Sequence, residues 1–128
     1  MSLDLRFFEH DNEDPLADLK ALSSDKLRKV ALWWLKRVRR DQTLGKHLGY
    51  QASTGDLRGL YKLYFEEDDE PWNPLWQPPD RHPGDPRPRY RIVYQLLPDD
   101  QQPELIEVIS IGPKPQVYWA AAERDDRE

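Results

Sequence analysis

The chain of 128 residues is long enough for one domain with one hydrophobic core and too short for two domains of ordinary size. It combines 38% hydrophobic with 34% charged residues and a net charge of −5. No apolar run approaches the length of a membrane span, so we expect a cytoplasmic protein without a membrane partner. The absence of cysteine excludes disulfides, thiolate metal ligands and cysteine nucleophiles.

The first part of the chain predicts one strand and two helices. Residues 3–7 alternate apolar with polar side chains, which is the period-two pattern of a half-buried strand. Asp14 followed by Pro15 is typical of a helix N-cap and a first helical residue, and Ser24 offers the cap of a second helix. The second helix is predicted over residues 25–40, where apolar residues recur at i, i+3, i+4 and i+7. Its apolar face must pack on something flat.

The second helix also concentrates the positive charge of the chain. Residues 26–46 hold eight basic residues and one acidic residue, a local charge of +7 that leaves −12 for the rest of the chain. This segregation predicts a basic face in spite of the acidic net charge. Lys36, Arg37 and Arg40 suit the negative end of the helix dipole, and they are also candidates to contact the phosphates of a nucleic acid.

A glycine-containing, irregular connection over residues 45–59 leads to a second strand at residues 60–65. Lys62 and Tyr64 share one face of that strand. The stretch 66–88 contains most of the prolines, two tryptophans and no periodicity, so it is predicted to be a long loop. Loops of this length inside a small domain are usually functional or disordered, and we expect this one to cover or flank a functional site.

The last third predicts two more strands and a short helix. Residues 89–97 alternate, and Arg91 lies on the opposite face from the aromatic residues of the strand. A hairpin turn at 98–103 leads to residues 105–111, which are apolar at most positions and therefore predict a central strand covered on both faces. Residues 116–123 are compatible with a closing helix.

This order of elements predicts one α+β domain over residues 1–128. It should contain a small, mostly antiparallel sheet, an N-terminal helical hairpin packed on one face, a short C-terminal helix and a charged tail at residues 123–128. The three histidines are isolated, and the acidic run at residues 66–70 lacks the glycine and ligand spacing of a calcium loop. We therefore interpret the acidic run as solvated and expect no metal site and no cofactor.

Three motifs in the last third occur in an order that resembles the RelE/ParE toxins of bacterial type II toxin-antitoxin systems. The first is YRxxY, from Tyr90 to Tyr94, and the second is VIxxG, which ends at Gly112 and is followed closely by Lys114. The third is VYxxAxxR, which ends at Arg124. The resemblance covers about the second half of the chain and implies a RelE-like fold.

The resemblance also implies a function. RelE toxins are ribosome-dependent endoribonucleases that cut messenger RNA, and a cognate antitoxin neutralises them. Carried over to this chain, the resemblance implies catalytic roles for four residues, with Lys114 in place of a family arginine: Lys62, Arg91, Lys114 and Tyr118. It implies RNA contacts by a second set: Arg58, Tyr64, Arg89, Lys36, Arg37 and Arg40.

The chemistry of such a cleavage explains why these residue types are needed. When a ribose 2'-hydroxyl attacks its own phosphate, the reaction needs a proton acceptor, cations that stabilise the developing charge, and an acid for the leaving oxygen. A tyrosine is a poor proton acceptor at neutral pH unless cations surround it. Lys62, Arg91 and Lys114 would give Tyr118 that setting without a protein-bound metal.

Two other functions are compatible with the same fold. The ParE branch of the family consists of non-catalytic proteins that inhibit DNA gyrase, which requires neither the tyrosine nor the phosphate-binding cations. A repurposed member of the fold would act as an interaction module. The first interpretation names a cognate antitoxin and messenger RNA on the ribosome as partners, with no small-molecule cofactor, and fold alone does not decide among the three.

Overall fold

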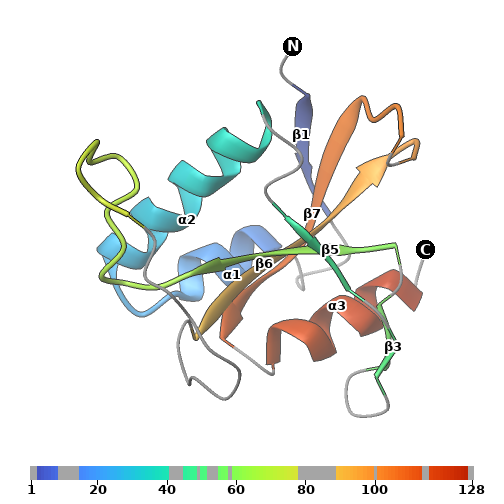
Figure 1. Cartoon of the computed structure of the whole chain (residues 1–128). Coiled ribbons are helices and arrows are strands. Elements are labelled where there is room, and N and C mark those ends of the chain that lie inside the picture. Colours follow the sequence, from blue (N-terminus) through green and yellow to red (C-terminus); the bar gives the residue numbers. More distant parts are fainter. Residues whose placement is uncertain are drawn as a thin grey trace.

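The computed structural model describes residues 3–8, 15–40, 45–48, 50–51, 55–57, 59–77, 89–99, 101–113 and 116–126. In this part of the chain, a central sheet has the strand order β1-β7-β6-β5-β2. Helices α1 (Pro15–Ala21) and α2 (Asp25–Val38) pack on one face of the sheet, and α3 (Gln116–Asp126) packs on the other (Figure 1). The predicted α+β class, with a helical hairpin on one face and a C-terminal helix, is confirmed.

Three consecutive long strands form the antiparallel centre of the sheet, as predicted. They are β5 (Tyr61–Phe65), β6 (Tyr90–Leu97) and β7 (Leu105–Pro113), and each pairs antiparallel with the next. The N-terminal strand β1 (Asp4–Phe7) pairs with β7 in parallel, with Asp4 opposite Leu105. Strand β7 therefore lies between the N-terminal strand β1 and strand β6.

Helix α2 starts where its sequence provides a cap. The Ser24 hydroxyl accepts a hydrogen bond of 3.1 Å from the backbone N–H of Leu27, which satisfies one of the free donors of the first turn. The guanidinium of Arg28 donates to the carbonyl oxygen of Leu22 at 2.6 Å and to that of Lys20 at 3.2 Å. These bonds hold the start of α2 against the end of α1 and close the helical hairpin.

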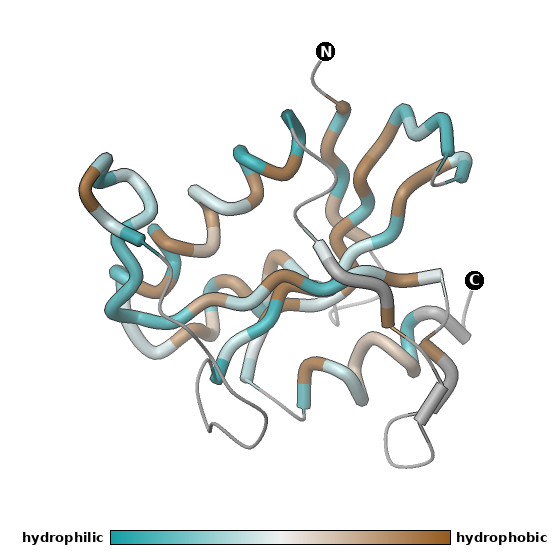
Figure 2. The backbone as a smooth tube through the Cα atoms, in the orientation of Figure 1, coloured by the Kyte–Doolittle hydropathy of each residue, from teal (hydrophilic) through white to brown (hydrophobic). Residues whose placement is uncertain are grey.

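The sheet separates two hydrophobic clusters. The larger cluster lies between the sheet and the α1–α2 hairpin, and includes Val30 and Leu35 from α2 with Phe65 and Ile92 from the strands. The smaller cluster lies under α3. Figure 2 shows hydrophobic stretches along the central strands and on the sides of the helices that face them. Most strand positions of β6 and β7 are buried because both of their faces are covered.

A β-bulge adjusts the middle of the sheet under α3. Val93 lies opposite Ser110, whereas the next residue, Tyr94, lies opposite Val108, so β7 has one additional residue at this point. The Ser110 hydroxyl donates a hydrogen bond of 2.8 Å to the carbonyl oxygen of Val117. The bulge thus brings a polar side chain to the first turn of α3, and this bond fixes the helix to the sheet.

The connection after α2 is more ordered than we expected from its sequence. It contains three two-residue strands, of which β2 (Lys46–His47) extends the central sheet by pairing with β5. The other two, β3 (Tyr50–Gln51) and β4 (Gly55–Asp56), pair with each other. Strands of two residues are too short to show a period-two pattern, which explains why the sequence predicted an irregular segment here.

Two charged side chains cover the free edge of β7. Strand β1 and the following Phe8 pair with β7, and the N–H of Phe8 donates to the carbonyl oxygen of Val108 at 2.8 Å. Further along β7, Asp18 accepts the N–H of Ile111 at 3.1 Å, and Arg124 donates to the carbonyl oxygen of Ile109 at 2.6 Å. The two side chains also form an ion pair of 2.7 Å with each other. They satisfy backbone groups of β7 that no described strand satisfies.

Helix α3 is longer than predicted, because it continues to Asp126, and its residue Arg124 is buried. The first part of the predicted charged tail is therefore helical. Within the described residues, every helix is too short or too polar to span a membrane. The same residues contain no cluster of three or more histidine, aspartate or glutamate side chains that could hold a metal ion.

Candidate functional site

Four of the predicted site residues come together on the α3 face of the sheet: Lys62, Tyr64, Arg91 and Tyr118. We call them the Arg91–Tyr118 cluster. On β5, residues 61, 63 and 65 point into the larger hydrophobic cluster, so Lys62 and Tyr64 point to the opposite side. Tyr64 lies directly opposite Arg91 on the neighbouring strand. Tyr118 reaches the same place from the first turn of α3.

A hydrogen bond between Arg91 and Tyr118 is the centre of the cluster. The Nε–H of Arg91 donates to the phenolic oxygen of Tyr118 at 3.0 Å, and another guanidinium nitrogen donates to the backbone oxygen of Tyr90 at 3.1 Å. The guanidinium lies 4.3 Å from the ring centre of Tyr64. Arginine is suited to this position, because its planar group can stack on an aromatic ring and donate several hydrogen bonds at the same time.

Lys62 adds a second positive charge to the cluster. Its ammonium lies 5.1 Å from the ring centre of Tyr64 and 6.0 Å from that of Tyr118. Arg91 and Tyr118 are each only 7% exposed, whereas Lys62 and Tyr64 are half-buried. Arg91 at the phenolic oxygen and Lys62 near the ring of Tyr118 form an arrangement that could stabilise negative charge on that oxygen or on a bound phosphate.

The other predicted RNA-contacting residues lie elsewhere. Arg89 precedes β6, and its exposed side chain is paired with Glu66. Lys36, Arg37 and Arg40 are exposed at the end of α2, across the sheet from α3 (Figure 1). These four residues are therefore not part of the Arg91–Tyr118 cluster. The remaining two, Arg58 and Lys114, lie outside the described residues.

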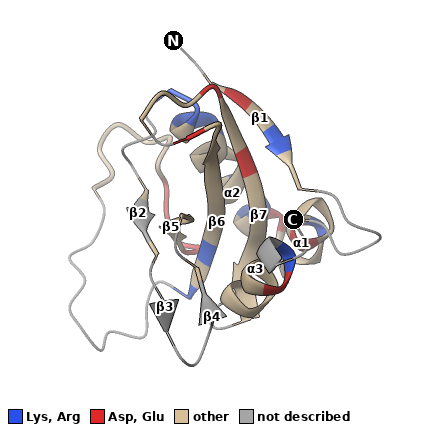
Figure 3. Ribbon diagram, turned by 90° about the vertical axis from the view of Figure 1, so that its right-hand side faces the viewer, with Lys and Arg blue, Asp and Glu red and all other residues tan. Residues whose placement is uncertain are grey.

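Charge along the central strands is confined to one position in each. Arg91 is the charged residue of β6, and Glu107 is that of β7. Figure 3 shows the basic position of β6 toward the end where α3 packs and the acidic position of β7 nearer the opposite end. Glu107 is buried and accepts hydrogen bonds of 2.6 Å from Arg6 and from Gln95 on the two neighbouring strands. It therefore links three strands at a distance from α3.

The acidic run after β5 is partly buried, so the interpretation that it is solvated is wrong for two of its residues. Glu66 and Asp69 are 1% and 3% exposed. The Glu66 carboxylate accepts hydrogen bonds from the backbone N–H of Arg89 at 3.0 Å and from the Arg89 guanidinium at 3.3 Å, and Asp69 accepts the N–H of Glu66 at 2.9 Å. Burial raises the pKa of Glu66, but the hydrogen bonds from Arg89 and Glu67 outweigh that effect, so its pKa is lowered.

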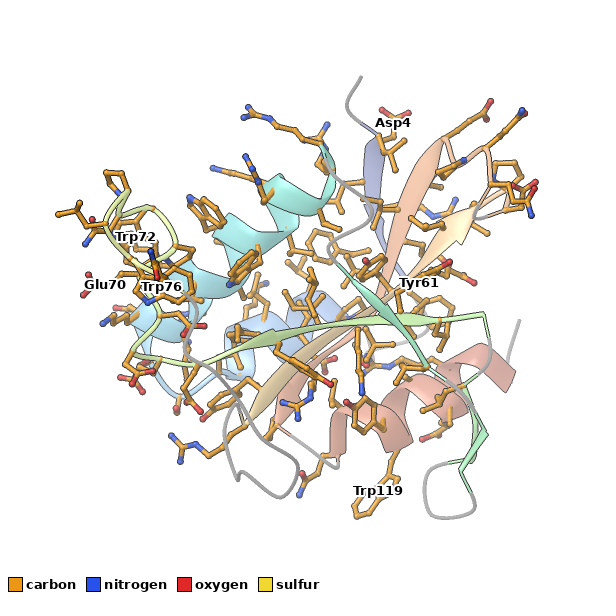
Figure 4. All side chains as sticks on the ribbon, viewed as in Figure 1. Asp4, Tyr61, Glu70, Trp72, Trp76 and Trp119 are labelled. Carbon is orange, nitrogen blue, oxygen red and sulfur yellow. The ribbon has the colours of Figure 1, made fainter. Side chains whose placement is uncertain are left out.

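The described part of the long loop packs on α2 and not on the cluster. Lys29 of α2 lies 4.3 Å from the ring centre of Trp72, and Trp34 of α2 packs edge-on against Trp76 at 6.5 Å. Figure 4 shows Trp72 and Trp76 beside α2, far from Trp119 on α3. Our expectation that the loop covers or flanks the site is therefore wrong for residues 66–77, and residues 78–88 lie outside the described residues.

A cavity of about 320 Å³ lies beside the cluster but does not include its cations or Tyr118. It is located between the end of α1, the end of β7 and the start of α3, and its lining includes Leu22, Ile111 and Val117. This lining is mainly apolar, in contrast to the two cations of the Arg91–Tyr118 cluster.

The sheet order, the helical hairpin on one face and the tyrosine-bearing C-terminal helix on the other define a small α+β protein with a RelE-like fold. The chain is similar to a solved structure of the E. coli toxin RelE, determined in the free state as a mutant with two arginines replaced by alanine. The two chains are 21% identical with a TM-score of 0.55, over 97% of this chain and 98% of RelE. No family model and no curated protein sequence matches the chain.

Proposed function

We propose that this protein is a RelE-type toxin that cleaves messenger RNA at the ribosome and that a cognate antitoxin neutralises. The observation that carries the proposal is the hydrogen bond of 3.0 Å from Arg91 to the phenolic oxygen of Tyr118, with Lys62 close by. The RelE-like fold supports the proposal, and three of the four residues to which the resemblance assigns catalysis, Lys62, Arg91 and Tyr118, lie together in the cluster.

The reaction follows from the chemistry of the cluster. Tyr118 acts in its phenolate form: it accepts the proton of a ribose 2'-hydroxyl and becomes a neutral phenol, while the 2'-oxygen forms a bond to the adjacent phosphorus. The bond from phosphorus to the 5'-oxygen of the next nucleotide breaks, which leaves a 2',3'-cyclic phosphate and a 5'-hydroxyl. Lys62 and Arg91 stabilise the negative charge that develops on the phosphate oxygens. Lys114 is the remaining cation of the set and is assigned to the proton of the leaving oxygen.

The burial of the cluster sets a condition on this mechanism. Arg91 and Tyr118 are each 7% exposed, so a phosphate group must displace or move part of α3 before it can contact both side chains. Burial also favours a second candidate function, in which the cluster is a structural bridge and the protein is a non-catalytic interaction module of the same fold. The two candidates differ in whether Tyr118 is needed for RNA cleavage.

We expect the antitoxin to lay a segment across the α3 face of the sheet. Such a segment would cover the half-buried Lys62, so that it would mask positive charge beside the proposed catalytic centre. We expect a partner segment of acidic character, since it must compensate the buried cations when it excludes water.

The decisive experiment is a cleavage assay with purified protein, messenger RNA and ribosomes. We expect cleavage only when ribosomes are present, and its loss in Tyr118→Phe and in Lys62→Ala. Trp119→Phe and Lys20→Ala are matched controls, because Trp119 is the exposed neighbour of Tyr118 on α3 and Lys20 is an exposed lysine of α1. Inhibition of gyrase supercoiling without RNA cleavage would support a ParE-like function. Harmless expression with neither effect would support the interaction module.

A further inference from the structure

Helix α2 carries a hollow of about 170 Å³ lined by Trp33, Lys36, Arg37 and Arg40. We call it the α2 hollow. The four residues are spaced at i, i+3, i+4 and i+7, so they lie on one side of the helix. The hollow is located on the opposite side of the sheet from the Arg91–Tyr118 cluster (Figure 1).

The side chains of the three cations are exposed, and the bond between Arg40 N–H and the Arg37 carbonyl oxygen at the helix end, 3.0 Å long, joins backbone atoms. The side chain that fixes this end of the helix is that of Arg39, whose Nε–H donates to the carbonyl oxygen of Leu3 at 2.9 Å. Cations at the C-terminal end of a helix interact favourably with the helix dipole, but this interaction does not require an aromatic residue beside them. Among the described residues, no acidic side chain lines the hollow.

Trp33 supplies an aromatic surface at the start of this row, about one helical turn before Lys36 and Arg37. It is half-buried, and it packs edge-on against Trp34 with ring centres 5.1 Å apart and an interplanar angle of 89°. This contact holds the indole in place from one side. A volume of about 170 Å³ is enough for one planar ring, since cavities of about 150 Å³ accept benzene.

The aromatic surface continues along α2. Trp76 packs against Trp34, and Trp72 lies under Lys29, so that aromatic and cationic groups alternate along the helix. Figure 4 shows Trp72 and Trp76 beside α2, and both Trp34 and Trp72 also pack against the larger hydrophobic cluster. The chain as a whole is acidic, and the local excess of cations is therefore a feature of this surface and not of the composition.

We propose that the α2 hollow binds single-stranded nucleic acid, with one base stacked on Trp33 and the neighbouring phosphates held by Lys36, Arg37 and Arg40. Single-strand binding sites combine these two elements: a row of cations that follows the backbone and aromatic side chains on which bases stack. The site is separate from the Arg91–Tyr118 cluster. It retains this binding even if the protein is not a nuclease, so the inference does not depend on the proposed function.

The test measures binding of a fluorescein-labelled RNA of about eight uridines, a length within the site sizes of single-strand binding proteins. All proteins in this test carry Lys62→Ala. This substitution removes the proposed cleavage and weakens binding of RNA to the Arg91–Tyr118 cluster on the other side of the sheet. Fluorescence anisotropy gives the Kd over a range of salt concentrations. Far-UV circular dichroism confirms that each variant is folded.

We expect Trp33→Ala to weaken binding on the order of 10-fold, because a stacked base is lost, whereas Trp33→Tyr keeps an aromatic face and binds nearly as well as its parent. Arg37→Gln and Arg40→Gln should each weaken binding and reduce the slope of log K against log salt by about 0.7. Lys20→Gln is the matched control on α1, and its binding should not change.

Three results would overturn the inference. The first is unchanged RNA binding in folded Trp33→Ala and Arg37→Gln proteins. The second is equally tight, Trp33-independent binding of a duplex RNA of the same length, which would indicate only a nonspecific attraction to phosphate. The third is a polyglutamate peptide that binds more tightly than the RNA and depends on Trp33, which would identify the α2 hollow as a docking site for an acidic protein segment.

Discussion

Arg91 on β6 and Tyr118 on α3 are joined by a hydrogen bond of 3.0 Å although they are 27 positions apart in the sequence. This bond connects the sheet to the helix that covers it. It also brings the phenolic oxygen next to a permanent positive charge, since an arginine in a protein stays protonated. Stability and the proposed catalysis therefore depend on the same contact, and they can be separated by mutation.

Tyr118→Phe should lower cleavage by a factor of about 100 or more, the usual contribution of an acid-base group, while the free energy of unfolding falls by only about 1–2 kcal/mol. The stability loss arises because a buried Arg91 donor loses its acceptor. Urea unfolding and the ribosome-dependent cleavage assay measure the two effects. In the double variant Arg91→Met/Tyr118→Phe, part of the stability should return and activity should not. If the loss of cleavage is proportional to the loss of stability in both variants, Tyr118 has a structural role alone.

Arg124 and Asp18 should be strongly coupled, because together they satisfy the free edge of β7. Arg124→Met should destabilise the protein by about 3 kcal/mol, since it leaves a carboxylate and a backbone oxygen without their donor. Lys20→Met, on the exposed side of α1, is the control. We expect the loss in Asp18→Asn/Arg124→Met to be smaller than the sum of the single losses in urea unfolding. Additive losses would mean that the two residues act independently.

Glu66 should make stability dependent on pH. Its pKa in the folded protein is lowered from the ordinary value of 4.5, so its contribution is complete above that value and disappears as pH falls through the folded-state pKa. The midpoint of urea unfolding should therefore fall between about pH 5 and pH 3, and Glu66→Gln should reduce this fall. Glu67→Gln is the control, because Glu67 is exposed. An identical pH profile in Glu66→Gln and its parent would contradict the assignment.

Gly45→Ala should be destabilising because of a close approach to a buried ring. A Cβ atom at Gly45 would lie 1.9 Å from the phenolic oxygen of Tyr94 and 2.7 Å from the ring carbon that bears it. Tyr94 cannot swing away easily, since it is fully buried and stacks on Tyr61 with ring centres 5.6 Å apart. We expect a loss of about 1–3 kcal/mol in thermal or urea unfolding. Tyr94→Phe removes the nearest atom, so it should recover part of the loss when it is combined with Gly45→Ala.

The sequence predicted the parts of the fold that depend on local periodicity. Strands β5 and β6 alternate over five or more residues, β7 is an almost continuous apolar run, and α2 has an apolar face and a serine cap. The parallel pairing of β1 with β7 could not be predicted in the same way, because periodicity shows that a strand exists and not which strand it pairs with. The two-residue strands before β5 were missed because they are shorter than any detectable period.

The site was predicted in part, for a similar reason. The alternation of β5 and β6, with the motif resemblance, was enough to bring Lys62 and Arg91 to one face, and the resemblance supplied Tyr118. The burial of Glu66 was not predictable, since an acidic run is normally solvated and its partner Arg89 follows 23 positions later. Glu66 can be buried because a residue that is distant in the sequence satisfies its charge.

The position of β7 between β1 and β6 has a consequence for how the protein is made. Because β1 needs β7 as its neighbour, β1 cannot be paired until β7, about 100 positions later in the sequence, has been synthesised. Contacts between such distant positions in the sequence slow folding, and an unpaired strand is prone to aggregation. A chaperone that binds nascent chains should therefore increase the yield of this protein during expression more than it does for a helical protein of equal length.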